Sequence, residues 1–230
     1  MKVNISHLTT GASKARGTAV IIDVFRAFSL ACYLFDRGAD RILAVRDVDR
    51  AFQLHRAHPD SVLVGERHAV KIPGFDHGNS PSEILQADLT GRTVIHTTHA
   101  GTRALVAAAG AADVITGSFV NAGAIVQYIQ AASPAEVSLV CAGFEGGRET
   151  LEDTLCAEYL RDLLAGRQPN FGSIRERIVG SECSRRFLHP VERTCPEEDL
   201  RLCLDLDRFD LVVRRTEAGD DLCVLQRLAI

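Results

Sequence analysis

The sequence predicts an α/β fold: a three-layer α/β/α domain with a largely parallel sheet. Short β-branched runs alternate with longer amphipathic segments over the first two-thirds of the 230 residues. Strands separated by helices need the crossover connections of parallel pairing, and strands that are apolar throughout belong in a sheet covered on both faces. No internal repeat or linker interrupts the chain, so we expect a single domain over residues 1–230.

The predicted elements alternate in order along the chain. Strands are expected at 18–24, 41–45, 61–65, 93–97, 113–116 and 136–141, where apolar and β-branched residues are concentrated. Helices are expected at 26–37, 47–57, 80–87, 102–109, 120–131 and 151–164. The first of these helices repeats its apolar residues at helical spacing and ends before Gly38, which is typical of a helix terminus.

The last third of the chain has a different composition. Residues 168–195 are polar and rich in arginine, and 196–206 predict a short helix whose acidic first turn, 197–199, suits the positive end of its dipole. Residues 210–215 and 222–227 predict a closing β-hairpin. We interpret this part as a C-terminal elaboration of the same domain.

Composition and charge exclude several classes of protein. Hydrophobic residues make up 46% and charged residues 24% of the chain, as in ordinary globular proteins, and the net charge of −4 provides no basic surface for nucleic acid or anionic membranes. No apolar run approaches the roughly 18–20 residues of a membrane span, and the N-terminus lacks a signal-peptide pattern. The seven cysteines include no C-x-x-C pair, which favours reduced thiols over disulfides or a zinc knuckle. We expect a cytoplasmic protein.

Polar residues gather directly after five of the predicted strands. They are Asp23 and Arg26, then Glu66, Arg67 and His68, the run 96–99, Ser118 with Asn121, and the segment 143–153. Ligands of open parallel sheets bind outside the carboxyl ends of the strands. We therefore expect one site at this edge of the sheet, although loops are polar in general.

Asp23 ends an apolar strand, where a carboxylate needs a partner. Asp23 could form a salt bridge to Arg26, bind Mg²⁺ or act as a phosphoryl-accepting nucleophile, and the sequence leaves these alternatives open. Glu66, Glu152 and Asp153 would complete the oxygen ligands that Mg²⁺ prefers. Glu152 and Asp153 point about 100° apart on a helix, so one of them, with Glu152 favoured, is expected to face the ion. Alternatively, either residue serves the helix dipole.

Two predicted helix starts offer backbone N–H groups to an anion. Residues 78–83 include Pro81 and have Ser80 and Glu83 at the spacing of a capping box, and a second helix begins near Gly101. Each start is by itself a simple helix cap, but two at one sheet edge favour a phosphate or carboxylate site. No Walker A or G-x-G-x-x-G pattern is present, so no nucleotide cofactor is expected.

Histidines and one cysteine are weaker candidates for the site. His68, His77, His96 and His99 surround it without the spacing of an H-E-x-x-H zinc motif. Any one of them could be a general acid, but each is more simply a loop or packing residue. Cys141 ends a strand and could be a nucleophile, although no neighbouring residue in the sequence suggests an activated thiol.

Taken in order, these segments resemble the 2-phosphosulfolactate phosphatase family. The resemblance rests on Ile22–Ala27, Gly65–Arg67, Gly74–Pro81, Thr97–Thr98 with Gly101–Thr102, Gly117–Ser118 with Asn121–Ala122, Cys141–Gly143 and Leu151–Asp153. It covers about 18–164 and implies an α/β/α fold and Mg²⁺-dependent hydrolysis of a phosphate monoester of a small sulfonated or carboxylated hydroxy acid. The family belongs to coenzyme M biosynthesis in methanogens and also occurs in bacteria that make no methane.

The resemblance implies roles for individual residues. Asp23, Glu66 and either Glu152 or Asp153 would hold Mg²⁺. Arg26 and Arg67 would bind phosphoryl oxygens or the second anionic group of the substrate. The substrate-binding residues would be Asn79, Ser80, Thr97, Thr98, Gly101, Thr102, Ser118 and Asn121. A homo-oligomer is also implied.

Two departures from the family pattern fall in the expected substrate pocket. Phe28, Ser29 and Leu30 replace a usual run of threonines, and Ala100 replaces a usual asparagine. Both changes remove hydrogen-bonding groups, on which discrimination between polar substrates depends. We expect hydrolysis of 2-phosphosulfolactate to sulfolactate and phosphate. The alternatives are a phosphatase for another small phosphorylated hydroxy acid and a non-catalytic homologue that binds an anion.

Overall fold

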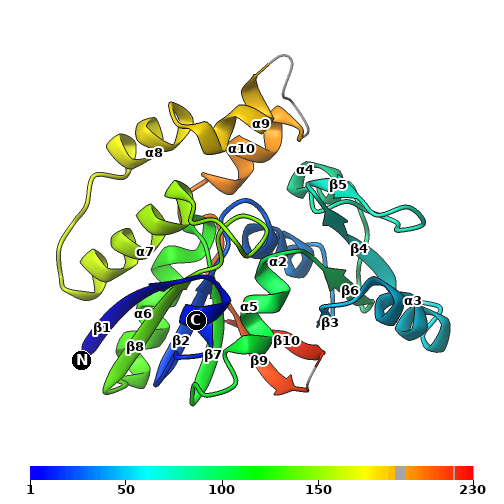
Figure 1. Ribbon diagram of the computed structural model, residues 1–230, viewed down its shortest axis with the longest axis horizontal. Coiled ribbons are helices and arrows are strands. Elements are labelled where there is room, and N and C mark those ends of the chain that lie inside the picture. Colours follow the sequence, from blue (N-terminus) through cyan, green and yellow to red (C-terminus); the bar gives the residue numbers. More distant parts are fainter. Residues whose placement is uncertain (190–194, 220, 230) are drawn as a thin grey trace.

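A ten-stranded sheet runs through the part of the protein that the computed structural model describes, residues 1–189, 195–219 and 221–229 (Figure 1). The strand order is β1-β8-β2-β7-β9-β10-β3-β6-β4-β5. The strands are β1 Lys2–His7, β2 Thr18–Ile22, β3 Arg41–Val45, β4 Val62–Arg67, β5 Val70–Lys71, β6 Thr93–Thr97, β7 Asp113–Gly117, β8 Glu136–Cys141, β9 Leu211–Ala218 and β10 Leu222–Ala229. Residues 190–194 of the expected polar segment lie outside the described residues.

The sheet consists of two parallel groups of strands joined by an antiparallel hairpin. Strands β1, β8, β2 and β7 pair in parallel, and so do β3, β6 and β4. Between them lies the hairpin, with β9 antiparallel to β7 and β10 antiparallel to β3. The predicted α/β class, the largely parallel sheet and the C-terminal hairpin are confirmed. The hairpin is nevertheless an internal part of the sheet, which the sequence did not predict.

Helices cover both faces of the sheet. They are α1 Leu8–Ala12, α2 Ala27–Asp36, α3 Val48–Ala57, α4 Pro81–Ile84, α5 Gly101–Ala107, α6 Ala122–Ala132, α7 Leu151–Leu164, α8 Phe171–Val179, α9 Arg185–Leu188 and α10 Glu197–Cys203, with short 3₁₀ turns η1 Phe119–Asn121 and η2 Glu182–Ser184. On β2, Ile21 packs in the apolar cluster of α2 and α5, whereas Val20 and Ile22 pack in that of α6 and α7. Alternate side chains of a strand point to opposite faces, so these helices form two layers.

Several elements were not predicted because their local patterns are weak. Strand β1 is half-exposed at the sheet edge, and α8 lies in the arginine-rich segment 168–195. The buried side of α8 is narrow: Phe171 and Ile174 are partly buried and Ile178 is fully buried. Helices α8 to α10 gather at the top of Figure 1, where α10 packs against α4. None of the described helices is long and apolar enough to cross a membrane.

The cysteines agree with the expectation of free thiols. None of the seven forms a disulfide bond among the described residues, and all except the half-buried Cys183 are buried. Burial raises the pKa of the Cys141 thiol, and the nearby Asp153 carboxylate raises it further. Because the reactive form of cysteine is the thiolate, this environment argues against Cys141 as a nucleophile.

Candidate functional site

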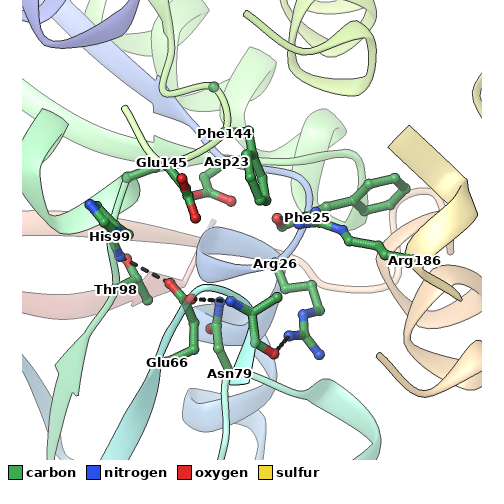
Figure 2. A pocket seen from close by; sticks show the side chains of 13 residues that line it. Asp23, Phe25, Arg26, Glu66, Asn79, Thr98, His99, Phe144, Glu145 and Arg186 are labelled. Carbon is green, nitrogen blue, oxygen red and sulfur yellow. Dashed lines mark hydrogen bonds between the residues drawn. The ribbon is translucent and has the colours of Figure 1, made fainter. Parts of the chain in front are cut away.

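A small pocket lies where the segments that follow β2, β4, β6 and β8 meet (Figure 2). Of the predicted site residues, five line it: Asp23, Arg26, Glu66, Asn79 and Thr98. The cavity volume is about 30 Å³, which accommodates a few water-sized groups. Strands β2 and β8 belong to one parallel group and β4 and β6 to the other, so the two groups contribute jointly to the pocket.

Asp23 directly follows β2, and its side chain is almost completely buried at 6% exposure. Its Oδ1 accepts a hydrogen bond of 3.1 Å from the backbone N–H of Ala27, at the start of α2. Its Oδ2 lies beside Gly101, where a Cβ atom would be only 2.9 Å away. The absence of a side chain at Gly101 therefore leaves room for the second carboxylate oxygen.

Four carboxylates, of Asp23, Glu66, Glu152 and Asp153, share the negative charge of this region. Burial raises the pKa of Asp23 to about 7; the Ala27 N–H and Arg186 oppose this rise, and the Glu66 and Glu152 carboxylates add to it. Burial also raises the pKa of Glu152. A divalent cation would relieve the repulsion among these groups and suit their oxygen atoms.

Glu66 is held in place by two backbone groups. Its Oε1 accepts a hydrogen bond of 3.0 Å from the N–H of His99, and its Oε2 accepts one of 2.8 Å from the N–H of Ala69. The carboxylate thereby links the end of β4 to the loop after β6. Each oxygen keeps a lone pair available for a ligand in the pocket.

Glu152 and Asp153 have different environments although both lie in the first turn of α7. Asp153 accepts hydrogen bonds from the N–H of Val24 at 2.8 Å and of Gly143 at 2.9 Å, and thereby joins the segments after β2 and β8. Glu152 lines an adjoining cavity, and its buried Oε2 has no hydrogen-bond partner among the described residues. Asp153 therefore positions backbone, whereas Glu152 has an oxygen available for a ligand.

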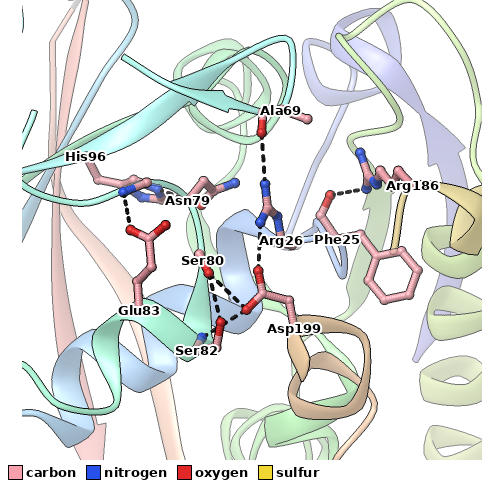
Figure 3. A network of polar contacts seen from close by, with 11 residues as sticks. Phe25, Arg26, Ala69, Asn79, Ser80, Ser82, Glu83, His96, Arg186 and Asp199 are labelled. Carbon is pink, nitrogen blue, oxygen red and sulfur yellow. Dashed lines mark hydrogen bonds and ion pairs between the residues drawn. The ribbon is translucent and has the colours of Figure 1, made fainter. Parts of the chain in front are cut away.

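Arg26 forms a buried ion pair with Asp199, not with Asp23 (Figure 3). Its Nη1 lies 2.7 Å from Asp199 Oδ2, and the side chains are 5% and 0% exposed. Arg26 also donates to the Ala69 carbonyl at 3.4 Å. The guanidinium at the pocket is thus held by a residue of α10, 173 positions away in the chain.

Asp199 also organises the start of α4. Its Oδ1 accepts hydrogen bonds of 2.9 Å from the Ser80 hydroxyl and from the N–H of Ser82. The expected capping box is wrong, because Ser80 bonds Asp199 while Glu83 accepts from the N–H of Gly78 at 2.8 Å. Asp199 lies in the first turn of α10, as expected for a residue that suits the helix dipole, but it is also buried and binds three groups.

The pocket wall also contains residues to which the sequence analysis gave no individual role: Phe25, Ala69, Phe144, Glu145 and Arg186. Arg186 donates to the Phe25 carbonyl at 2.8 Å, and its guanidinium carbon lies 5.3 Å from the centre of the Phe144 ring. Its buried Nε has no hydrogen-bond partner in the described part of the chain. The arginine-rich composition of 168–195 was the one available signal for this cation.

Two further predicted groups are engaged within the protein. Arg67 donates 2.9 Å hydrogen bonds to Thr97 Oγ1 and to the Arg46 carbonyl and does not line the pocket. The Thr102 hydroxyl donates to the Thr98 carbonyl at 2.7 Å, within the first turn of α5. These side chains stabilise the loops around the pocket. Because the Arg67 guanidinium bonds Thr97 and Arg46, it does not reach the pocket in this structure.

Ser118 and Asn121 lie outside the pocket. The Ser118 hydroxyl donates to Asn121 Oδ1 at 3.4 Å, and the Asn121 amide donates to the Leu211 carbonyl of β9 at 3.2 Å. Both side chains are buried and connect the end of β7 to the hairpin. Of the two departures from the family pattern, Ala100 lines the pocket, whereas Phe28 is buried in the core.

His96 is expected to make the stability of the protein depend on pH. The ring is buried beside Asn79, with Nε2 3.2 Å from Oδ1, and burial together with Arg67 lowers the pKa of His96 from 6.5 to about 4. Between these values the unfolded chain binds a proton that the folded chain does not. The free energy of unfolding is therefore unaffected by the titration of His96 above pH 6.5. It falls by about 3 kcal/mol as the pH drops from that value to the lowered pKa.

Urea unfolding of the wild type and the His96→Gln variant, near neutral pH and near the lower pKa, measures this contribution. The loss of unfolding free energy on acidification should be smaller in the variant by most of that amount. Equal losses in the two proteins would show that His96 is not the group responsible.

Comparisons with known proteins identify the family of the chain. A family model described as 2-phosphosulpholactate phosphatase matches residues 4–218. A "Probable 2-phosphosulfolactate phosphatase" of Symbiobacterium thermophilum is 39% identical over 214 residues, which cover 86% of this chain and 91% of the relative. Proteins with the same name from Bacillus subtilis and Thermoplasma acidophilum are 32% and 33% identical, over 87% and 84% of this chain and 88% and 83% of their own lengths. The match extends from β1 to β9, and the chain belongs to the 2-phosphosulfolactate phosphatase family.

Proposed function

We propose that the protein is a Mg²⁺-dependent phosphatase that hydrolyses 2-phosphosulfolactate to sulfolactate and phosphate. The observation that carries this proposal is that the buried Asp23 and Glu66 carboxylates line one pocket with Arg26 and Arg186, while the buried Glu152 lines the adjoining cavity and acts on Asp23 electrostatically. Phosphoryl transfer requires oxygen ligands that hold a divalent cation and positively charged side chains that bind the phosphate group, and the pocket region offers both. The choice of 2-phosphosulfolactate as substrate rests on the names of the relatives described above.

The carboxylates fit a magnesium ion by their chemistry. Glu152 has a buried oxygen without a hydrogen-bond partner among the described residues, and Asp23 has one oxygen beside Gly101 that does not receive the Ala27 hydrogen bond. These two residues and Glu66 would hold Mg²⁺. When bound, the ion would neutralise phosphoryl charge and lower the pKa of a water molecule.

The arginines and Asn79 would orient the substrate. Arg26 is fixed by Asp199, and Arg186 is held against Phe144 with its Nε unpaired among the described residues. Since His96 Nε2 lies at Asn79 Oδ1, the amide nitrogen of Asn79 is the end left to donate to a ligand. Guanidinium and amide donors of this kind bind phosphoryl or sulfonate oxygens.

The pocket also favours exclusion of water from a bound phosphate. The Phe144 ring lies beside Asp23 and Glu145 in Figure 2, and the Arg186 guanidinium lies near both the Phe144 and the Phe25 rings. In such an environment, interactions between charges are stronger than in water. Ala100 lies in this wall, where the family pattern usually has an asparagine. Of the two departures from that pattern, this one bears most directly on the choice of substrate.

The test is release of phosphate from 2-phosphosulfolactate, phospholactate and phosphoglycolate, with Mg²⁺ and with EDTA. We expect Mg²⁺-dependent release with the highest kcat/KM on 2-phosphosulfolactate. A higher kcat/KM on phospholactate would instead support a phosphatase for another hydroxy acid. Folded protein that binds phosphate and releases none from any substrate would support a non-catalytic anion-binding homologue. The cytoplasmic location, the homo-oligomer and the single-domain organisation stay predictions from the sequence.

A further inference from the structure

Three side chains of types that bind metal ions lie close together at the rim of the pocket. His68 follows β4, His99 follows β6, and Glu145 lies in the loop after β8; one ligand atom from each lies within 4.8 Å of the other two. His68 Nδ1 and Glu145 Oε1 are 2.6 Å apart, and the two imidazole rings are 5.4 Å apart. Donor atoms around one tetrahedral zinc ion are roughly 3.4 Å apart, so small side-chain movements suffice to enclose an ion.

We propose that His68, His99 and Glu145 bind one divalent ion of the zinc type, at a site distinct from the Asp23–Glu66–Glu152 carboxylates. Two imidazoles and one carboxylate suit Zn²⁺ or Co²⁺, whereas Mg²⁺ prefers oxygen ligands alone. The proposed zinc site rests on His68, His99 and Glu145 and does not depend on the proposed phosphatase activity.

The environment of His99 supports the proposal independently of the cluster. Its backbone N–H donates to Glu66, which fixes the residue, but its side-chain Nδ1 is shielded from solvent and has no hydrogen-bond partner in the described ranges. A buried polar atom without a partner costs free energy, which a ligand at that atom would remove. A bound metal ion would supply this partner.

The charges around the cluster determine the role of Glu145. The side chains of Arg67 and Arg103 act on His99 as positive charges, and those of Glu66 and Glu145 as negative charges. Because Glu66 already accepts two backbone hydrogen bonds, Glu145 is the carboxylate free to turn from His68 toward an ion. Three protein ligands would leave a fourth coordination position for water or another ligand, and two of the three, His99 and Glu145, line the pocket.

The test uses the full-length protein without a histidine tag, stripped of metal with EDTA and dialysed. Calorimetry with Zn²⁺ and absorption with Co²⁺ should give one ion per chain and the visible bands of a tetrahedral cobalt site. Excess Mg²⁺ should not displace the cobalt, whereas Zn²⁺ should. No binding by the folded wild type would overturn the proposal.

Variants identify the ligands. His68→Ala, His99→Ala and Glu145→Gln should each weaken Zn²⁺ binding at least about tenfold, and His68→Ala should fold normally because its side chain is 72% exposed. The matched control His58→Ala removes an exposed histidine at the end of α3 and should bind as the wild type does. Equal Zn²⁺ affinity in all four variants would assign the ion to other residues. So would loss of Zn²⁺ binding in Cys183→Ser, since Cys183 lines the neighbouring cavity that His68 also lines.

A further variant separates this site from the proposed activity. Asp23→Asn should still bind one Zn²⁺ with the wild-type affinity even if its Mg²⁺-dependent phosphate release is lost. Loss of zinc binding in Asp23→Asn with retention in His68→Ala would show that zinc occupies the carboxylate site, and would overturn the second site alone. Failure of phosphate release in every protein would leave the zinc result unchanged.

Discussion

The Asp23→Asn variant is expected to lose Mg²⁺-dependent phosphate release by roughly 10³-fold in kcat while retaining its fold. The amide oxygen can still accept the hydrogen bond from Ala27, but the charge beside Glu66 and Glu152 is removed. Burial disfavours the charged form of Asp23 in the metal-free protein. The substitution should therefore raise, not lower, the free energy of unfolding without Mg²⁺.

Phosphate release and urea unfolding, both measured on the same preparations, check these opposite effects. Asp60→Asn makes the same chemical change at an exposed aspartate between α3 and β4 and should leave both quantities near their wild-type values. Activity of Asp23→Asn within a few-fold of the wild type would remove Asp23 from the proposed mechanism.

The Asp199→Ala variant is expected to lose about 3–5 kcal/mol of unfolding free energy. It leaves the buried Arg26 guanidinium without its carboxylate and removes the acceptor of the Ser80 hydroxyl and the Ser82 N–H. Because Arg26 lines the pocket, the affinity for inorganic phosphate should fall as well. Chemical unfolding and phosphate titration at a temperature where the variant is folded measure the two losses.

An exposed ion pair supplies the control for Asp199. Asp205 lies 2.8 Å from Arg208 with both side chains well exposed, and its replacement by alanine should cost less than about 1 kcal/mol. A similar small cost for Asp199→Ala would mean that the buried pair with Arg26 contributes no more than a surface pair. Asp199→Asn, which keeps an acceptor for Ser80 and Ser82, should fall between the two alanine variants.

Much of the fold was predictable because its signals are local. Each of the six predicted parallel strands overlaps an observed strand, and the expected strand at 18–24 corresponds to the fully buried β2. A run of apolar β-branched residues specifies such a strand wherever it is placed in the sheet. The elements in 168–195 were missed because α8 buries a narrow apolar face among arginines, so its helical periodicity is weak.

The candidate site was predictable in position but not in its pairings. Asp23 follows β2, Glu66 lies near the end of β4 and Asn79 precedes α4, and their place at one sheet edge follows from that order. The ion-pair partner of Arg26 and the cation Arg186 come from the C-terminal third, where the only local signal was an arginine-rich composition that singles out no residue. Likewise, the exact difference between Glu152 and Asp153 depends on the backbone groups that each one meets.

By itself, the sequence determined the alternation of strands and helices, the polar strand ends and the resemblance to the family, because each depends on residues that are near one another in the chain. The tertiary structure alone decided that the hairpin β9–β10 joins the two parallel groups and that both groups contribute to one pocket. It also decided that Asp199 holds Arg26 and that His68, His99 and Glu145 meet at the rim. The physical reason is that buried charges and unpaired ligand atoms are satisfied by whichever distant segments the packing of the core brings beside them.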